Sequence, residues 1–79
     1  MLALVKFKCD NEDIKSKIIT DLEKIYGKRI NTCNYDGVNY ISLSSHDNNI
    51  VEKFKKVKEK YSGKKEVKEF FVGTTKEWY

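Results

Sequence analysis

The side chains that could support catalysis or metal binding in this chain are few and widely spaced. The sequence contains one histidine, His46, and two cysteines, Cys9 and Cys33, separated by 24 and 13 residues. These spacings do not resemble those of zinc sites. A Cys33–His46 nucleophile pair would need a setting that favours the thiolate and donors for an oxyanion, and the local sequence supplies neither. We therefore expect no enzyme activity, no metal and no cofactor.

Other residues that often carry chemistry have simpler explanations. His46 lies beside Asp47 at an expected helix start, where capping and solvent exposure are the usual roles. No glycine-rich phosphate loop is present, and each glycine is expected to be a cap or a turn. Glu52 and Lys56 illustrate the interleaving of carboxylates with lysines at i,i+4 spacing, which is typical of ion pairs on a helix surface.

Lysine is the more informative residue type. The chain has 16 basic and 12 acidic residues, a net charge of +4, and Arg29 is its one arginine. Lysine contacts phosphate as a point charge, whereas arginine supplies the bidentate fork that reads bases. A run over residues 53–68 contains eight lysines, of which Lys53, Lys56 and Lys60 are expected to bind a partner. Because glutamates are mixed into this run, an ordinary solvated helix face is the alternative interpretation.

Periodicity in the first half predicts the elements that position these residues. Residues 2–9 alternate as a strand with one buried side. A helix follows, capped by Asp10 or Asn11, with a helical stripe at Ile14, Ile18, Leu22 and Ile25, and Gly27 ends it. Residues 28–35 have strand composition but imperfect alternation, which indicates a bulge or an edge position. Cys9 and Cys33 fall in these strand-like segments and are expected to be small buried hydrophobes.

The second half repeats the pattern of strand and helix. Asp36-Gly37 predicts a type I′ turn, since both central residues of that turn need positive φ. Residues 38–44 form the return strand, and capping residues at 45–49 precede a helix with its stripe at Ile50, Phe54, Val57 and Tyr61. Residues 65–74 read as a last strand, which residues 75–79 would extend. The whole chain, residues 1–79, is expected to be one domain.

The resulting order β-α-β-β-α-β predicts an α+β, ferredoxin-like sandwich. One four-stranded antiparallel sheet carries both helices on one face, and its first and third strands are central. The other face would present lysine beside apolar and aromatic groups, a combination that suits stacking on unpaired bases or docking on a protein. The residues expected there are Leu2, Leu4, Lys6, Lys8, Val38 and Tyr40. Residues 37–43 resemble in pattern the third-strand motif of RNA-recognition-motif domains, with Val38 where that family stacks an aromatic ring.

A second resemblance covers the hairpin and the start of the second helix. Residues 34–45 and 49–54 resemble part of a phage-encoded anti-CRISPR family that inhibits the RNA-guided nuclease of type II systems. In that family the Asp-Gly hairpin touches the motif-reading site of the nuclease. The resemblance implies that Asp36, Gly37 and Asn39 contact a partner. The chain is basic where that family is acidic.

These observations predict a small binding protein without catalytic activity. The first hypothesis is a phage or mobile-element inhibitor that binds a host protein or ribonucleoprotein complex through Tyr35, Asp36, Gly37, Asn39, Tyr40 and the helix lysines. The alternative is a weakly specific RNA- or DNA-binding domain. A homodimer that pairs through an edge strand is a third possibility. No run of residues is apolar enough to span a membrane, and few cysteines favour a reducing cytoplasm.

Overall fold

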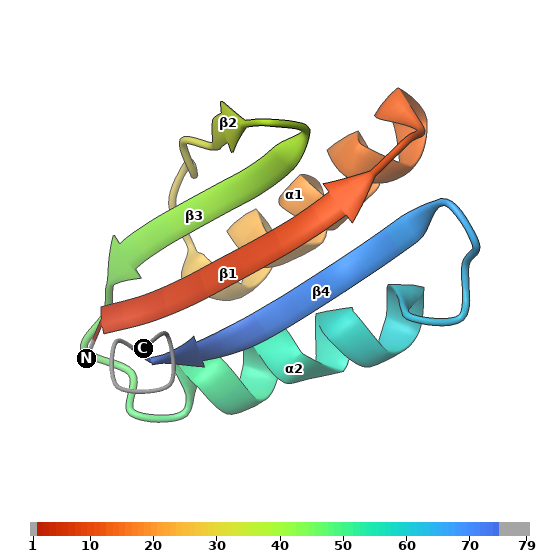
Figure 1. Ribbon diagram of the computed structural model, residues 1–79. Coiled ribbons are helices and arrows are strands. Elements are labelled where there is room, and N and C mark those ends of the chain that lie inside the picture. The colour runs from red at the N-terminus through yellow and green to blue at the C-terminus, as the bar shows by residue number, and fades with distance from the viewer. Residues whose placement is uncertain (1, 75–79) are drawn as a thin grey trace.

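Helices and strands follow one another in the predicted order in the computed structural model of the chain, which describes residues 2–74 (Figure 1). The elements are β1 (Leu2–Cys9), α1 (Glu12–Tyr26), β2 (Cys33–Tyr35), β3 (Val38–Ser44), α2 (Ile50–Tyr61) and β4 (Val67–Thr74). The expected extension by residues 75–79 lies outside the described residues.

The four strands form one antiparallel sheet in the order β2-β3-β1-β4, which confirms the ferredoxin-like arrangement with β1 and β3 at the centre. Both helices lie behind the sheet in the view of Figure 1, so no helix within residues 2–74 covers its other face. α2 packs against β4 and α1. The register of β1 against β3 runs from Leu2↔Ser44 to Lys8↔Val38.

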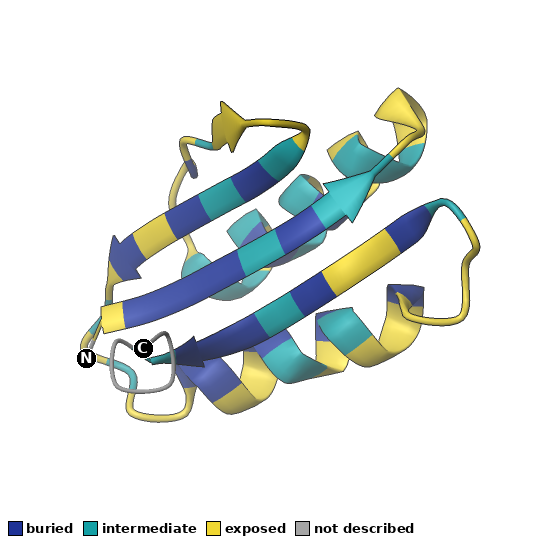
Figure 2. Cartoon of the chain, in the orientation of Figure 1, coloured by how far each residue is buried: buried dark blue, intermediate teal, exposed yellow. Residues whose placement is uncertain are grey.

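The core fills the space between the sheet and the helices. Ala3, Val5 and Phe7 of β1 are fully buried, as the alternation predicts. The Phe7 ring stacks on Phe70 of β4, with centroids 5.3 Å apart and 22° between the planes. The helix residues Ile18, Leu22, Ile50 and Phe54 close the core from the other side. Figure 2 shows the alternation of buried and less buried residues along β3, whereas three successive residues are buried in the first half of β1.

Local signals fix the ends of α1 and the hairpin turn. The side chain of Asn11 accepts a hydrogen bond from the backbone N–H of Ile14 at 3.1 Å, which makes Asn11 the N-cap. Gly27 ends the helix in the left-handed conformation at φ 83°. Asp36 and Gly37 have φ values of 53° and 80°, the two positive angles that a type I′ turn requires.

The predicted strand at residues 28–35 is wrong in its extent, because only Cys33–Tyr35 pairs with β3. The backbone N–H of Ile30 donates to a Glu23 carboxylate oxygen at 2.9 Å, and the Ile30 side chain is buried. This anchor to α1 holds the segment before β2 away from the sheet. The expectation of a buried Cys33 is also wrong. Cys33 is exposed on the short edge strand, while Cys9 is half-buried against the core.

β4 contains a bulge that the sequence pattern did not indicate. Its register against β1 shifts between Lys6↔Phe71 and Lys8↔Lys68, so two residues of β4 lie opposite Phe7. Glu69 sits at the shift with φ 53°. The extra residue reverses the alternation, and Val67 and Phe70, three positions apart, are therefore both buried.

Replacing Glu69 with glycine is expected to raise the free energy of unfolding by about 0.5–1 kcal/mol, because a non-glycine residue in the left-handed region is strained. Urea denaturation followed by circular dichroism measures the change. Lys68→Gly is the matched control. Lys68 lies on the same strand and has no positive φ, so glycine there is expected to lower stability. Equal losses in the two variants would contradict the assigned strain.

A polar contact joins the two helices. The Tyr61 hydroxyl donates to Oδ2 of Asp21 at 2.7 Å, and Nζ of Lys60 lies 2.9 Å from the same oxygen. Partial burial alone would raise the pKa of Asp21, but the hydrogen bonds from Tyr61 and Lys60 outweigh it and hold the pKa below its ordinary value of 3.8. Because the folded pKa is lowered, the ionised carboxylate stabilises the folded state above about pH 4. That contribution is lost as the pH falls through the folded pKa.

Asp21→Asn is therefore expected to lower the free energy of unfolding by about 1 kcal/mol at neutral pH. The difference from the unmodified protein is expected to shrink as the pH falls below 3.8. Urea unfolding at several pH values from neutral to strongly acidic tests this. A difference that is the same at pH 2 and pH 7 would show that the charge of Asp21 is not the cause.

Candidate functional site

The helix-free face of the sheet places aromatic rings and lysines side by side. Tyr40 of β3 pairs with Lys6 of β1, and Lys6 pairs on its other side with Phe71 of β4. All three side chains are half-buried. Neighbouring strands lie about 4.8 Å apart, so the two rings flank the lysine at a separation of about 10 Å.

The next row toward the hairpin is more exposed and more basic. Lys8 pairs with Val38 of β3 and with Lys68 of β4. The Lys8 side chain reaches the hairpin turn. A β-carbon added to Gly37 would lie 3.6 Å from Cε of Lys8. Lys68 lies 3.8 Å from a carboxylate oxygen of Asp10. We call Lys6, Lys8, Tyr40, Lys68 and Phe71 the aromatic–lysine patch.

The sequence predicted part of this patch. Lys6, Lys8 and Tyr40 were expected on this face, and β1–β3 pairing places them there. Phe71 was missed, and Lys68 was expected only as part of the lysine run of residues 53–68, because the bulge at Glu69 decides which β4 residues face away from the helices. The adjacent Phe70 and Phe71 were the available signal, since neighbouring strand residues point to opposite faces.

At the other end of the same face the structure differs from expectation. Leu4 was expected among the exposed apolar groups, but it is only 8% exposed. Leu2 is 38% exposed. The apolar end of the face therefore offers less surface than its sequence suggests, and the aromatic–lysine patch is the part with charged groups.

Asn39 does not present its side chain to a partner. It is 1% exposed, because it shares the helix-facing side of β3 with Ile41 and Leu43. Its side chain accepts a hydrogen bond from Asn34 at 3.1 Å and donates to the carbonyl of Phe7 at 3.4 Å. Its role is to bind β1, β2 and β3 together, so we omit it from the candidate surface.

The hairpin and the α2 lysines do not form one surface. Tyr35, 74% exposed, and the Asp36–Gly37 turn lie at the β2 edge of the sheet. Lys53, Lys56 and Lys60 lie on α2, which packs under β4 at the opposite edge (Figure 1). All three are exposed. Any partner that touches both groups must reach across the sheet or around it.

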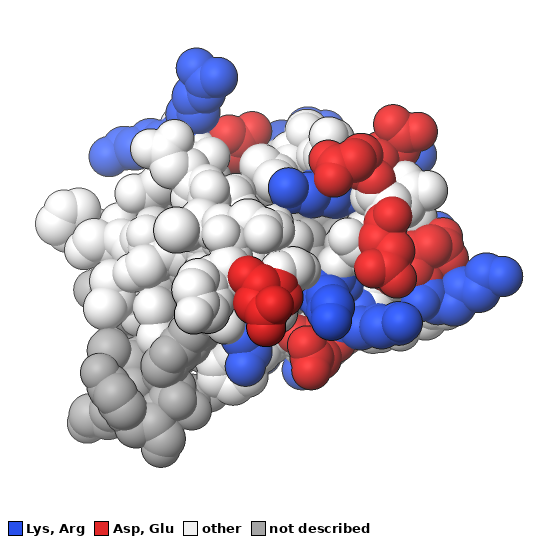
Figure 3. All heavy atoms as spheres, turned by 45° about the horizontal axis from the view of Figure 1, so that its top comes forward, with Lys and Arg blue, Asp and Glu red and all other residues white. Residues whose placement is uncertain are grey.

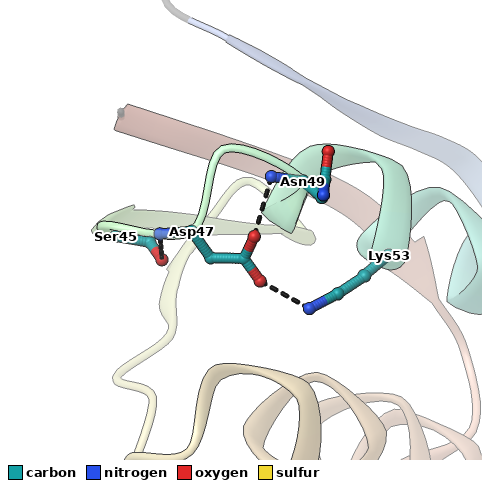
Figure 4. A network of polar contacts seen from close by, with 4 residues as sticks. All are labelled: Ser45, Asp47, Asn49 and Lys53. Carbon is teal, nitrogen blue, oxygen red and sulfur yellow. Dashed lines mark hydrogen bonds and ion pairs between the residues drawn. The ribbon is translucent and has the colours of Figure 1, made fainter.

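Lys53 and Lys60 also take part in contacts within the protein. Lys60 bonds to Asp21 between the helices, and Nζ of Lys53 lies 2.6 Å from Oδ2 of Asp47 (Figure 4). The other Asp47 oxygen accepts from the backbone N–H of Asn49 at 2.8 Å. Lys53 and this N–H hold the pKa of Asp47 below its ordinary value. Asp47 thus supports the start of α2 while His46 is exposed, which favours a structural role for this cluster.

Charge on the visible surface is mixed and not of one sign. Figure 3 shows blue and red side chains gathered together toward the right of the view, with mainly uncharged residues to the left. Within residues 2–74, no group of three or more histidine, cysteine, aspartate or glutamate side chains is placed to hold a metal ion. None of the helices in that range has the length and apolar character needed to cross a membrane.

Searches against protein-family models and against curated proteins found no match to this chain.

Proposed function

We propose that this chain binds single-stranded nucleic acid on the helix-free face of its sheet. The observation that supports this most is the row Tyr40–Lys6–Phe71, in which the strand register places a lysine of β1 between aromatic residues of the two neighbouring strands. Lys8 and Lys68 continue the positive charge in the next row. A single strand laid across the sheet would meet rings for its bases and ammonium groups for its phosphates.

The chemistry of these residues favours weak sequence preference. Stacking of a base on an aromatic side chain contributes about 1–3 kcal/mol and tolerates any base, since every base has a π-face. Lysine neutralises phosphate without the bidentate geometry that distinguishes bases. Duplex DNA or RNA has its bases stacked internally, so the rings would have no partner there. We therefore expect single strands to bind more tightly than duplexes of the same length.

The hypothesis of an inhibitor of a host nucleic-acid-targeting complex stays a prediction. The geometry supports it less well, because its expected surface is divided between two sheet edges and the side chain of Asn39 is buried. Edge-to-edge homodimerisation likewise stays a prediction.

Salt dependence tests the proposal directly. With Lys6, Lys8 and Lys68 each neutralising one phosphate, the logarithm of the association constant is expected to fall against the logarithm of salt concentration with a slope of about −2. Fluorescence anisotropy with a labelled ten-nucleotide RNA, the matching DNA strand and a duplex measures this. Lys8→Glu is expected to weaken binding and reduce the slope.

Lys56→Glu is the matched control, because it makes the same charge change on an exposed helix residue away from the patch. Equal weakening by Lys8→Glu and Lys56→Glu would show that binding follows net charge alone. No anisotropy change with any probe at low salt would exclude direct nucleic-acid binding.

A further inference from the structure

β3 is longer than the edge strand that covers it. β1 pairs with β3 as far as Ser44, whereas β2 pairs only with Val38–Tyr40. Among the described residues, no strand lies beside Ile41–Ser44 on the β2 side. This length of β3 is therefore a free sheet edge of four residues, about 14 Å long.

The backbone groups that point outward along this edge can be identified. Tyr35 and Val38 flank the two-residue turn and form a hydrogen-bonded pair, so every second residue of β3 from Val38 onward directs its N–H and C=O away from β1. Ser42 and Ser44 belong to this set. The carbonyl of Ser44 accepts a hydrogen bond from the Tyr26 hydroxyl at 3.0 Å, which agrees with an outward direction. Ser42 carries the outward donor and acceptor at the middle of the edge.

A groove runs along this edge. It has a volume of about 290 Å³ and is lined by Tyr26, Arg29, Ile30 and Asn31 on one side and by Ser42, Leu43 and Ser44 on the other. Its far wall is the segment before β2 that the Ile30–Glu23 hydrogen bond holds away from the sheet. Ile30, which makes this hydrogen bond, is itself one of the residues that line the groove.

The charge of the groove selects the kind of occupant. Among the described residues that line the groove, Arg29 is the one that carries a charge, and the exposed Lys28 precedes it. The nearby Glu23 carboxylate already accepts the Ile30 N–H. A guanidinium binds a carboxylate with two parallel hydrogen bonds, which makes an acidic side chain the complementary group. A second copy of the chain paired on this edge about a two-fold axis would bring two Arg29–Lys28 pairs together, and like charges disfavour that arrangement.

We propose that the free edge of β3 accepts an extended peptide as an added strand, with a carboxylate side chain of the peptide bound by Arg29. The peptide backbone pairs with the N–H and C=O of Ser42, and its neighbouring side chains lie in the groove over Ile30 and Leu43. This interaction surface is separate from the aromatic–lysine patch, so a partner protein and a nucleic-acid strand have different sites.

Nuclear magnetic resonance of the full chain tests this with synthetic probes. The probes are an acetylated and amidated Thr-Val-Glu-Val-Thr peptide, its Gln analogue, and a version of the Glu peptide N-methylated at alternate residues. The Glu peptide is expected to shift the amide signals of Ser42 and Ser44 and to slow hydrogen exchange at Ser42. The Gln analogue and the N-methylated peptide are expected to bind at least about 10-fold more weakly, through loss of a charge-assisted pair or of backbone pairing.

Arg29→Gln is expected to remove the preference for the Glu peptide over the Gln peptide while leaving the spectrum of the folded chain intact. Lys56→Gln is the control and is expected to keep that preference. Equal binding of the N-methylated peptide would overturn strand addition, and an unchanged Glu preference in Arg29→Gln would overturn the role of Arg29. Absence of peptide shifts, or a dimer that shields Ser42 without peptide, would also overturn the proposal. Lys8→Glu is expected to weaken RNA binding without changing peptide binding, so either proposal can fail while the other holds.

Discussion

Replacing Tyr40 with alanine is expected to weaken binding of a single-stranded oligonucleotide by about 5- to 150-fold, because one stacked base contributes about 1–3 kcal/mol. Tyr40 lies on a central strand and is flanked in register by Lys6 and Cys33. Tyr40 therefore lies on the β3 side of the aromatic–lysine patch, next to Lys6. Anisotropy titration at one fixed salt concentration measures the change.

Tyr40→Phe is the matched control, since it keeps the ring and removes the hydroxyl. It is expected to bind within about two-fold of the unmodified protein if stacking is the main interaction. A large loss in Tyr40→Phe would assign the effect to the hydroxyl. Unchanged affinity in Tyr40→Ala would exclude Tyr40 from the binding surface. Circular dichroism of both variants establishes that they are folded.

Replacing Phe7 with alanine is expected to lower the free energy of unfolding by about 3–5 kcal/mol. Phe7 is fully buried and stacks on Phe70, so its removal leaves a cavity and an unpaired ring. A domain of this length has a total stability of about 4–12 kcal/mol, so the variant is expected to be marginal or unfolded at room temperature if the chain lies in the lower half of that range.

Phe7→Leu keeps most of the volume and is expected to cost less than half as much, which keeps the prediction measurable if Phe7→Ala does not fold. Urea unfolding of both variants gives the two values. A loss below about 1 kcal/mol in Phe7→Ala would mean that the core is not built around this ring.

Most of the fold could be predicted because its signals are local. The alternation in β1, the stripe in α1, the αL glycine at Gly27 and the Asp36–Gly37 turn each depend on neighbouring residues alone. The errors come from contacts between distant residues. The backbone N–H of Ile30 bonds to Glu23 and β2 begins only at Cys33, and no periodicity in residues 28–35 indicates either feature. The bulge at Glu69 depends on packing of Phe70 against β1.

The candidate site could be predicted only in part for the same reason. Lys6, Lys8 and Tyr40 lie on strands whose alternation is regular, so their face was evident. Phe71 required knowledge of the bulge. Asn39 was assigned to the surface by its resemblance to a hairpin contact residue, although its parity with Ile41 places it on the core side. Charge alone suggested Lys53 and Lys60, whose structural partners Asp47 and Asp21 lie six and 39 residues away.

The proposed binding site for a single nucleic-acid strand is the helix-free face of the sheet. Mapping of chemical-shift changes in the full chain on titration with the ten-nucleotide RNA tests it most directly. We expect the largest changes at the ring and side-chain signals of Tyr40, Phe71, Lys6, Lys8 and Lys68, with small changes on α1 and α2. Changes confined to the α2 lysines, or to the Tyr35–Gly37 turn alone, would contradict the claim.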